Sequence, residues 1–343
     1  MQESPLIQPE ELDPIARQAG KILEELNKIL LGHRDLHRMV LIGILSRGHI
    51  LLEGLPGVGK TALIKALGQL LQLRFNRVQF TPDLMPGDIL GTNILQERED
   101  GGRDMVFHPG PIFTNILLAD EINRASPKTQ SAMLEAMQEA AVTLLGETRE
   151  LPFPFFVLAS QNPIELEGTY PIPEAQLDRF MFELQVNTVD SETLSEIISS
   201  RRRGQAPVPE WKLSEAELRQ LFAAMERIFL PRAVSSYIAR LVAASHPGGA
   251  EALPEVNDYV SYGASPRAAI AMAEAARGAA LLRGRPAAGF GDVREVAPAV
   301  LNHRLILNYK ARMDNVDSRG IIANLLEKVD EAGLTLPEEI AIR

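Results

Sequence analysis

The chain has 343 residues, no cysteine, and 35 basic against 45 acidic side chains, which gives a formal charge of −10. The missing cysteines exclude a disulfide scaffold, a thiol nucleophile and a thiolate metal site, and the acidic balance disfavours a general nucleic-acid coat. Because domains usually span about 150 residues, this length predicts two domains with ample core.

No stretch of the chain has the length and apolar character of a membrane span. The best candidate, residues 39–52, is interrupted by Arg47 and His49. The N-terminal Met-Gln-Glu-Ser-Pro lacks the basic and then apolar order of a signal peptide. We therefore expect a soluble, cytoplasmic protein without membrane insertion.

The first half of the chain alternates helical patterns with short apolar runs. Apolar residues recur at helical spacing over residues 10–30, and a second helix is expected over 33–46. A run at 49–53, ended by Gly54, is typical of a buried strand. Three similar apolar runs follow at 115–119, 155–159 and 180–186. The main helical pattern between them covers residues 126–140. Buried strands alternating with helices predict a parallel sheet covered on both faces.

Two β-hairpins are predicted from turn signals. Residues 94–97 and 104–107 flank Glu-Asp-Gly-Gly at 99–102. Residues 142–145 and 148–151 flank Gly146-Glu147.

The composition changes near residue 204, where Gly-Gln-Ala-Pro-Val-Pro predicts a linker. Helical patterns dominate after it, over residues 214–229, 231–245, 266–283 and 290–311. We therefore predict an α/β domain over residues 1–203, with N-terminal helices and the two hairpins, and an all-α domain over 204–343.

Residues 54–61, Gly-Leu-Pro-Gly-Val-Gly-Lys-Thr, fit the phosphate-loop pattern G-x-x-x-x-G-K-[ST] between an expected strand and an expected helix. The glycines let backbone N–H groups turn toward an anion at the helix N-terminus. Lys60 would reach the β- and γ-phosphates and the Thr61 hydroxyl would coordinate Mg²⁺. The alternative is an incidental glycine-rich turn. The residues expected to bind the nucleotide here are Gly54, Pro56, Gly57, Val58, Gly59, Lys60, Thr61 and Ala62.

Polar side chains follow two of the expected strands at the edge where open α/β sheets bind ligands. Asp120 and Glu121 end one run: Asp120 would hold Mg²⁺, through water, and Glu121 would polarise an attacking water. Asn162 follows another run and would orient that water or contact the γ-phosphate, although an Asn before Pro is also a common turn.

Together these residues resemble the AAA+ ATPases and, within them, the MoxR family. The resemblance covers roughly residues 30–310 and is strongest in Leu-Leu-Ala-Asp-Glu-Ile-Asn-Arg-Ala-Ser-Pro-Lys-Thr-Gln at 117–130. It continues through Leu-Glu-Ala-Met-Gln-Glu at 134–139, Ala-Ser-Gln-Asn-Pro-Ile at 159–164, Glu-Gly-Thr-Tyr-Pro at 167–171 and Glu-Ala-Gln-Leu-Asp-Arg-Phe at 174–180. Residues 81–91, Thr-Pro-Asp-Leu-Met-Pro-Gly-Asp-Ile-Leu-Gly, are similar to the family as well.

The resemblance implies an AAA+ P-loop core followed by a helical lid, assembled as a ring, usually a hexamer, with ATP and Mg²⁺ between subunits. It makes residues 54–61 the Walker A loop, Asp120 and Glu121 the Walker B pair, and Asn162 sensor 1. It implies that the two hairpins are inserts facing the ring pore. Neither carries an obvious aromatic grip, which disfavours processive unfolding.

Two further arginines match the family pattern. Arg179, in Leu-Asp-Arg-Phe, matches the arginine finger that reaches a neighbour's γ-phosphate, with a local pair to Asp178 or Glu174 as the alternative. Arg124 is a rival for that role. Arg267 matches sensor 2.

The residues before Arg267 support a functional role for this arginine. Ser265 and Pro266 are good N-cap and N1 residues, which puts this cation in the first turn of a helix, where an anionic partner would explain it. A solvated arginine is the alternative.

Gln79 ends the short run Arg77-Val-Gln-Phe80. The resemblance suggests a polar switch residue that contacts Glu121, and the alternative is a simple strand-end glutamine. Residues 29–33 lie where the family contacts adenine, whereas His33 itself is interpreted as a helix-cap or surface histidine.

Our main hypothesis is a Mg²⁺-dependent ATPase of the MoxR type that remodels protein clients as a ring. Family members often act with von Willebrand factor A domain proteins, so such a protein is one expected partner; no such domain is seen in this sequence. The alternatives are a nucleotide-switched scaffold with incidental turnover and a DNA-dependent AAA+ motor, which the acidic charge disfavours.

Overall fold

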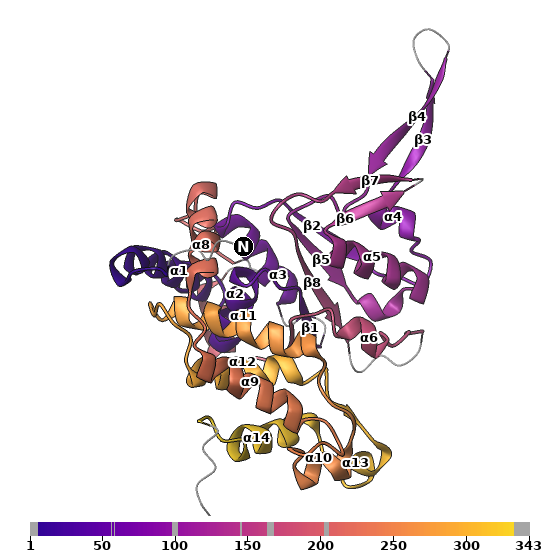
Figure 1. The fold of residues 1–343 in the computed structure, drawn as a ribbon. Helices are drawn as coiled ribbons and strands as arrows, with labels where there is room; N and C mark the ends of the chain where they lie inside the picture. The colour runs from indigo at the N-terminus through magenta and orange to yellow at the C-terminus, as the bar shows by residue number, and fades with distance from the viewer. Residues whose placement is uncertain are drawn as a thin grey trace, which may run out of the picture. The chain divides into compact units, whose positions relative to one another are not determined.

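The computed structural model describes residues 6–55, 57, 59–97, 102–144, 146–162, 168–201 and 206–332. The chain divides into two compact units, each with its own core (Figure 1). Residues 18–222 form one, here called the sheet unit, and residues 1–17 with 223–343 form the other, here called the helical unit. The division runs inside α1 (Pro9–Ile29) and α8 (Glu215–Arg227).

A five-stranded parallel sheet lies at the centre of the sheet unit, in the order β2-β5-β8-β1-β9. Its strands are β1 (Ile50–Gly54), β2 (Phe75–Gln79), β5 (Ile116–Asp120), β8 (Phe156–Gln161) and β9 (Phe182–Val186). The four predicted apolar runs are therefore confirmed as strands. The run that ends at Gln79 becomes the fifth strand, β2, at one edge of the sheet, and Val78 is its one buried residue.

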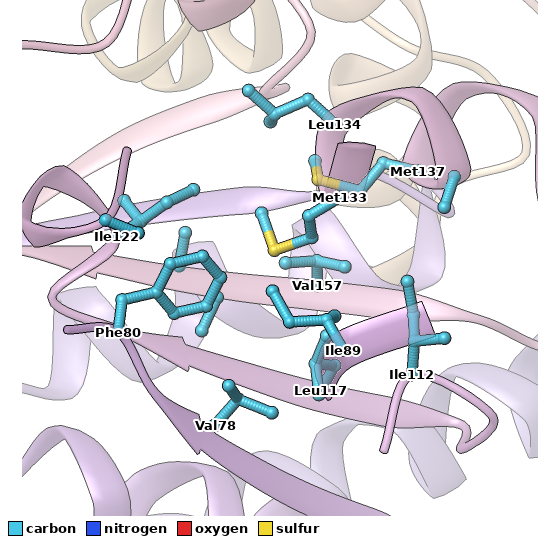
Figure 2. Close-up of a cluster of buried hydrophobic side chains, with 14 of the residues drawn as sticks. Val78, Phe80, Ile89, Ile112, Leu117, Ile122, Met133, Leu134, Met137 and Val157 are labelled. Atoms are coloured by element: carbon cyan, nitrogen blue, oxygen red, sulfur yellow. The ribbon is translucent and has the colours of Figure 1, made fainter. Parts of the chain in front are cut away.

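Helices cover both faces of the sheet, as predicted. Figure 1 shows α3 (Lys60–Leu70) and α5 (Pro127–Glu139) on opposite sides of it. On the α5 side, Met133 and Met137 pack over Leu117 and Val157 in a buried cluster (Figure 2). The remaining helical segments of the sheet unit are α2 (Arg34–Leu45), α4 (Pro86–Leu90), the 3₁₀ turn η1 (Ile122–Arg124), α6 (Glu174–Leu177) and α7 (Ser191–Ser200).

Both predicted hairpins form. The first joins β3 (Gly91–Glu97) to β4 (Arg103–Pro109), and its expected turn at 99–102 lies outside the described residues except for Gly102. The second joins β6 (Ala141–Leu144) to β7 (Glu147–Glu150). Leu144 pairs with Glu147, so the two connecting residues lie one position earlier than predicted, and Gly146 supplies the positive φ of 83° that such a turn needs.

The helical unit contains two of the predicted helices, α9 and α11, with small changes of boundary, and the predicted helix over 214–229 is α8, through which the division between the units runs. Its longest helix, α11, packs against α9 and α12 through a row of buried alanines, which lets the helices approach closely. The described helices and strands of this unit are α9 (Arg232–Ala244), α10 (Pro254–Tyr259), β10 (Val260–Tyr262), α11 (Pro266–Leu282), α12 (Phe290–Leu301), β11 (Ile306–Leu307), α13 (Tyr309–Met313) and α14 (Ser318–Lys328).

The single helix predicted over residues 290–311 is wrong. α12 ends at Leu301, and the chain then forms β11, which pairs with β10, before a new helix begins. The side chain of Asn308 caps that new helix by accepting from the backbone N–H of Ala311 at 3.1 Å. An Asn at this position is an N-cap signal, and the continuous apolar pattern concealed it.

The boundary between the compact units differs from the predicted one near residue 204. The segment after it packs on the sheet unit: the backbone N–H of Leu213 donates to the carbonyl of Leu70 at 2.7 Å, and the Lys21 ammonium lies 4.5 Å from the ring centre of Trp211. These contacts tie residues 206–222 to the sheet unit, although their composition resembles that of a linker followed by a new domain. Among the described residues, no helix has both the length and the apolar character needed to cross a membrane.

A half-buried histidine, His49, links three elements of the sheet unit and predicts an acid-sensitive fold. Its Nδ1 accepts from the backbone N–H of Val157 at 3.0 Å, so the proton must sit on Nε2, which donates to the carbonyl of Met137 at 3.1 Å. Burial lowers the pKa of His49 from 6.5 to about 4. Between these two pH values His49 is neutral in the folded protein but protonated in the unfolded chain.

We expect the stability that neutral His49 supplies to be complete above pH 6.5 and to fall by about 3 kcal/mol as the pH drops to about 4. Urea unfolding followed across this range measures the loss, and His49→Gln, which cannot titrate, should show a smaller pH dependence. Equal pH dependence in both proteins would contradict the assignment.

Candidate active site

The phosphate loop connects β1 to α3 as the motif predicts. Gly57 and Gly59 have positive φ values of 85° and 95°, which glycine adopts without strain, and Pro56 and Val58 lie outside the described residues. Gly54 is required for a different reason: a Cβ there would lie 2.3 Å from the carbonyl oxygen of Val186 on the neighbouring strand. The loop thus starts where β1 leaves no room for a side chain against β9.

Lys60, Thr61 and Ala62 form the first turn of α3, where unpaired backbone N–H groups favour an anion. The ammonium of Lys60 donates to the carbonyl of Gly54 at 2.7 Å. Partial burial lowers the pKa of Lys60, and the charges of Asp120, Glu121 and Glu53 oppose that shift. The lysine and the two Walker B carboxylates therefore act on one another electrostatically within one site.

Asp120 ends β5, and Glu121 follows it in the left-handed conformation, with φ 55° and ψ 49°. Ser160, fully buried on the adjacent strand β8, ties the two together: its hydroxyl donates to Asp120 Oδ1 at 2.5 Å and accepts from the backbone N–H of Glu121 at 3.0 Å. A non-glycine residue in this conformation is uncommon and is held here by its neighbours.

Strand β2 places two more polar residues beside these carboxylates. The guanidinium of Arg77 donates to Asp120 Oδ2 through Nε at 3.1 Å and through a terminal nitrogen at 2.7 Å. That terminal nitrogen also lies 2.7 Å from Gln79 Oε1, and Gln79 Nε2 donates to Glu121 Oε2 at 2.7 Å. The predicted contact between Gln79 and Glu121 is confirmed.

Arg124 completes this network from η1. Its terminal nitrogen lies 3.0 Å from Glu121 Oε2, so one carboxylate oxygen of Glu121 accepts from both Arg124 and Gln79. Each Walker B carboxylate is thus paired with one arginine of its own chain.

The donor set suits magnesium. Carboxylate and hydroxyl oxygens, from Asp120 and the exposed Thr61, are the hard ligands that Mg²⁺ takes in proteins, usually one or two of them together with substrate phosphates. Within the described part of the chain there is no group of three or more acidic, histidine or cysteine side chains that could hold a metal, and a Mg²⁺–nucleotide site needs none.

Asn162 lies directly after β8, with 6% of its surface exposed, between the ends of β5 and β1 in the sheet. The residue before it, Gln161, donates to Glu53 of β1 at 3.4 Å, and Gln185 of β9 donates to the same carboxylate. Glu53 of β1, the strand that leads into the phosphate loop, is therefore linked to the ends of both neighbouring strands, β8 and β9.

A cavity of about 440 Å³ opens beside the phosphate loop within the sheet unit. Gly57, Gly59, Lys60 and Ala62 line one part of it, and the rest is largely apolar, built from the end of α1, the start of α2, the segment after β9 and α7. This combination of an apolar pocket with a few polar groups is typical of a nucleotide site. His33, interpreted from sequence as a cap or surface residue, lines the cavity together with His37.

The two other predicted arginines, Arg179 and Arg267, belong to different compact units. Arg179 follows α6 and is partly buried, and its terminal nitrogen donates to the carbonyl of Leu134 in α5 at 2.6 Å. Arg267 occupies the first turn of α11 in the helical unit, where the Ser265 hydroxyl accepts from its backbone N–H at 3.2 Å, so the predicted cap is confirmed.

Arg77, Ser160 and Glu53 carry contacts of the site but were given no role from sequence. A signal for Arg77 was present: it stands two residues before Gln79 in a strand, and alternate residues share one face of a sheet. Ser160 likewise precedes Asn162 by two residues.

Comparisons with known proteins agree with this geometry. Residues 49–182 match the model of the "ATPase family associated with various cellular activities (AAA)", and residues 254–325 match that of the "AAA lid domain". The chain is 44% identical over 308 residues to "Chaperone MoxR1" of Mycobacterium tuberculosis, which covers 89% of this chain and 80% of the relative. The chain belongs to the MoxR family of AAA+ ATPases.

A second MoxR relative and a solved structure extend this result. "Protein MoxR" of Methylorubrum extorquens is 32% identical over 84% of this chain and 88% of its own length. A crystal structure from Cytophaga hutchinsonii, described provisionally as an ATPase, superposes with a TM-score of 0.85 at 38% identity and covers 94% of this chain and 97% of its own. The AAA+ core, the lid and a nucleotide-binding, chaperone-like MoxR assignment are therefore established for this chain.

Proposed function

We propose that this MoxR protein hydrolyses ATP in a Mg²⁺-dependent reaction and uses the energy to remodel or activate protein clients. The observation that carries the proposal is the site itself, in which Lys60 of the phosphate loop lies in the field of Asp120 and Glu121 beside the cavity. A phosphate loop, a strand-end carboxylate pair and an adjoining apolar pocket are the parts that ATP hydrolysis requires.

We propose the following roles within the site. The backbone N–H groups at the start of α3 and the Lys60 ammonium would bind the β- and γ-phosphates, for which Lys60 must leave the Gly54 carbonyl. Thr61 and Asp120 would hold Mg²⁺, which when bound neutralises phosphate charge. Glu121 would orient and deprotonate the attacking water, with Asn162 next to it as the polar sensor. Gln79 and Arg124 would restrain Glu121 until ATP is in place.

We further propose a ring, usually a hexamer, in which residues 1–203 act as the ATPase core and 204–343 as the lid. Arg124 is paired with Glu121 of its own chain, which favours a role within that chain. We therefore assign the trans-acting role to Arg179 and a γ-phosphate sensing role to Arg267 on the lid. The core and lid matches to separate stretches of the chain support this division.

The client would be a protein, acting in the cytoplasm, and a von Willebrand factor A domain protein is one candidate. The first hairpin supports contact with a client, because Ile94, Leu95 and Met105 on it are about half exposed (45%, 54% and 59%). Its aromatic residue, Phe107, is instead half-buried: the Arg149 guanidinium of the second hairpin lies 4.0 Å from its ring centre. Aliphatic rather than aromatic contact suits remodelling better than processive threading.

Two other functions make different predictions. A nucleotide-switched scaffold would hydrolyse ATP slowly with or without a client, whereas a remodeller should be stimulated by its client. A DNA-dependent motor should be stimulated by DNA, and an unchanged rate with added DNA would exclude it. Proteins that co-purify with an ATP-trapped ring would identify the client.

Lys60→Ala is expected to abolish tight nucleotide binding, because no other cation in the described loop lies at the start of α3. Titration with a fluorescent ATP analogue measures the loss, and Lys65→Ala, on a later turn of the same helix, is the matched control. Wild-type affinity in Lys60→Ala would contradict the assignment of the phosphate site.

A further inference from the structure

The Walker B aspartate is held by a cation of its own chain. Both donors of Arg77, Nε at 3.1 Å and the terminal nitrogen at 2.7 Å, converge on one oxygen, Asp120 Oδ2. The other oxygen, Oδ1, accepts the Ser160 hydroxyl at 2.5 Å. The Asp120 side chain is 15% exposed and that of Arg77 is 47% exposed, so Arg77 can withdraw into solvent while Asp120 stays in the site.

A guanidinium and a divalent ion cannot both contact Oδ2 at close range. Two like charges a few ångströms apart repel strongly in a partly desolvated site, and the second charge of a divalent ion doubles that repulsion. Ser160 is neutral and leaves the Asp120 charge intact. Arg77 is therefore the group that must leave before a magnesium ion, or a water bound to that ion, can reach this oxygen.

Arg77 also orients the amide that holds the second carboxylate. Its terminal nitrogen donates to Gln79 Oε1, which places the amide NH₂ of Gln79 toward Glu121, 2.7 Å from Oε2. When Arg77 leaves, Gln79 loses the contact that sets which end of its amide faces Glu121. Displacement of Arg77 would thus affect Asp120 directly and Glu121 through Gln79.

We propose that Arg77 is a positioning residue that competes with Mg²⁺ for Asp120, so that arrival of the metal releases Arg77 and loosens the hold of Gln79 on Glu121. Hydrolysis is then coupled to correct metal binding, because Glu121 is restrained until Asp120 is occupied. The inference rests on the proposed Mg²⁺-dependent ATPase and adds the residue that links the metal to the glutamate.

The test is a Mg²⁺ titration of nucleotide binding without turnover, using the intact protein and a fluorescent, non-hydrolysable ATP analogue. Arg77→Ala and the more conservative Arg77→Gln should lower the Mg²⁺ concentration at half-saturation by roughly 3- to 10-fold, the range for a partly exposed, charge-assisted pair. Nucleotide affinity in EDTA should stay as in the wild type. Thermal unfolding checks that each variant folds.

Arg219→Ala is the matched control. Arg219 donates to one oxygen of Glu215 through Nε at 3.2 Å and a terminal nitrogen at 2.8 Å, the same arrangement as at Arg77, but on α8. Its Mg²⁺ midpoint should equal that of the wild type. In an Asp120→Asn background the effect of Arg77→Ala should disappear, because the contested carboxylate is gone.

An unchanged or raised Mg²⁺ midpoint in both Arg77 variants would overturn the inference, as would an equal shift in the Asp120→Asn background. Absence of Mg²⁺-dependent nucleotide binding in the wild type would instead overturn the proposed function, so the two failures are distinguishable. A raised midpoint would specifically mean that Arg77 prepares Asp120 for the metal rather than competing with it.

Discussion

Glu121→Gln is expected to bind ATP with near wild-type affinity and to lower the rate of hydrolysis by about 10²–10⁴-fold, the usual contribution of a positioned general base. The amide keeps the shape of the side chain and can still contact Gln79 and Arg124, so the site should remain assembled. It cannot accept the proton of the attacking water. Phosphate release at saturating ATP measures the loss.

Glu139→Gln, at the exposed end of α5, is the matched control for Glu121→Gln and should turn over normally. Equilibrium binding of labelled ATP distinguishes a loss of hydrolysis from a loss of nucleotide binding. Lys60→Ala is expected to lose nucleotide binding, whereas Glu121→Gln should keep it. Normal phosphate release by both Glu121→Gln and Lys60→Ala would refute the ATPase assignment.

Arg179→Ala is expected to lower hydrolysis by about 10³–10⁵-fold, the contribution of an arginine finger in related phosphoryl transfers. If Arg179 acts on a neighbour's nucleotide, rings that mix Arg179→Ala with Lys60→Ala subunits should regain part of the activity. At some interfaces of such rings, an Arg179→Ala subunit supplies an intact phosphate loop and its Lys60→Ala neighbour supplies an intact Arg179. Phosphate release from purified mixed rings measures the rescue.

Arg124→Ala separates the two candidate arginines in the same experiment. Because Arg124 is paired with Glu121 of its own chain, its loss disables the subunit that carries it, and mixing with Lys60→Ala subunits should restore nothing. Rescue by the Arg124 mixture, with none by the Arg179 mixture in equally stable rings, would reverse the assignment.

Much of the candidate site was predictable because its motifs are local. Residues 54–61 have a fixed spacing, and the strand, loop and helix that confirm them are adjacent in the chain. Asp120 and Asn162 follow apolar strands, and parallel strands end at one edge of a sheet. These predictions depend on the order of strands and helices along the chain and not on how those elements pack.

Other parts of the site depend on which strands become neighbours. Arg77 contacts Asp120 only because β2 pairs with β5 in a register that places Gln79 opposite Asp120. A shift of one residue would turn Arg77 and Gln79 to the other face. The bond from Ser160 to Asp120 depends in the same way on the pairing of β8 with β5.

The cavity likewise combines segments that lie far apart in the chain, from His33 near its start to Ala206. No periodicity in one segment reports on the others. The sequence therefore indicates the cap position of His33, at the start of α2, but not the cavity that it lines. The end of α12 at Leu301 and the packing of residues 206–222 on the sheet unit were concealed for the same reason, since a pairing strand or a neighbouring surface decided them.

The sequence by itself determined the αβα class of the core, the strand, loop and helix around residues 54–61, the two carboxylates at the end of a buried strand and, through the absence of cysteine, a chemistry without thiols. These features are written in short segments whose local physics, buried strands and a helix N-terminus, is independent of distant contacts. Only the tertiary structure decided how the charges are paired. The 35 basic side chains look interchangeable in the total of −10, but strand register brings Arg77 to one carboxylate and a turn brings Arg124 to the other.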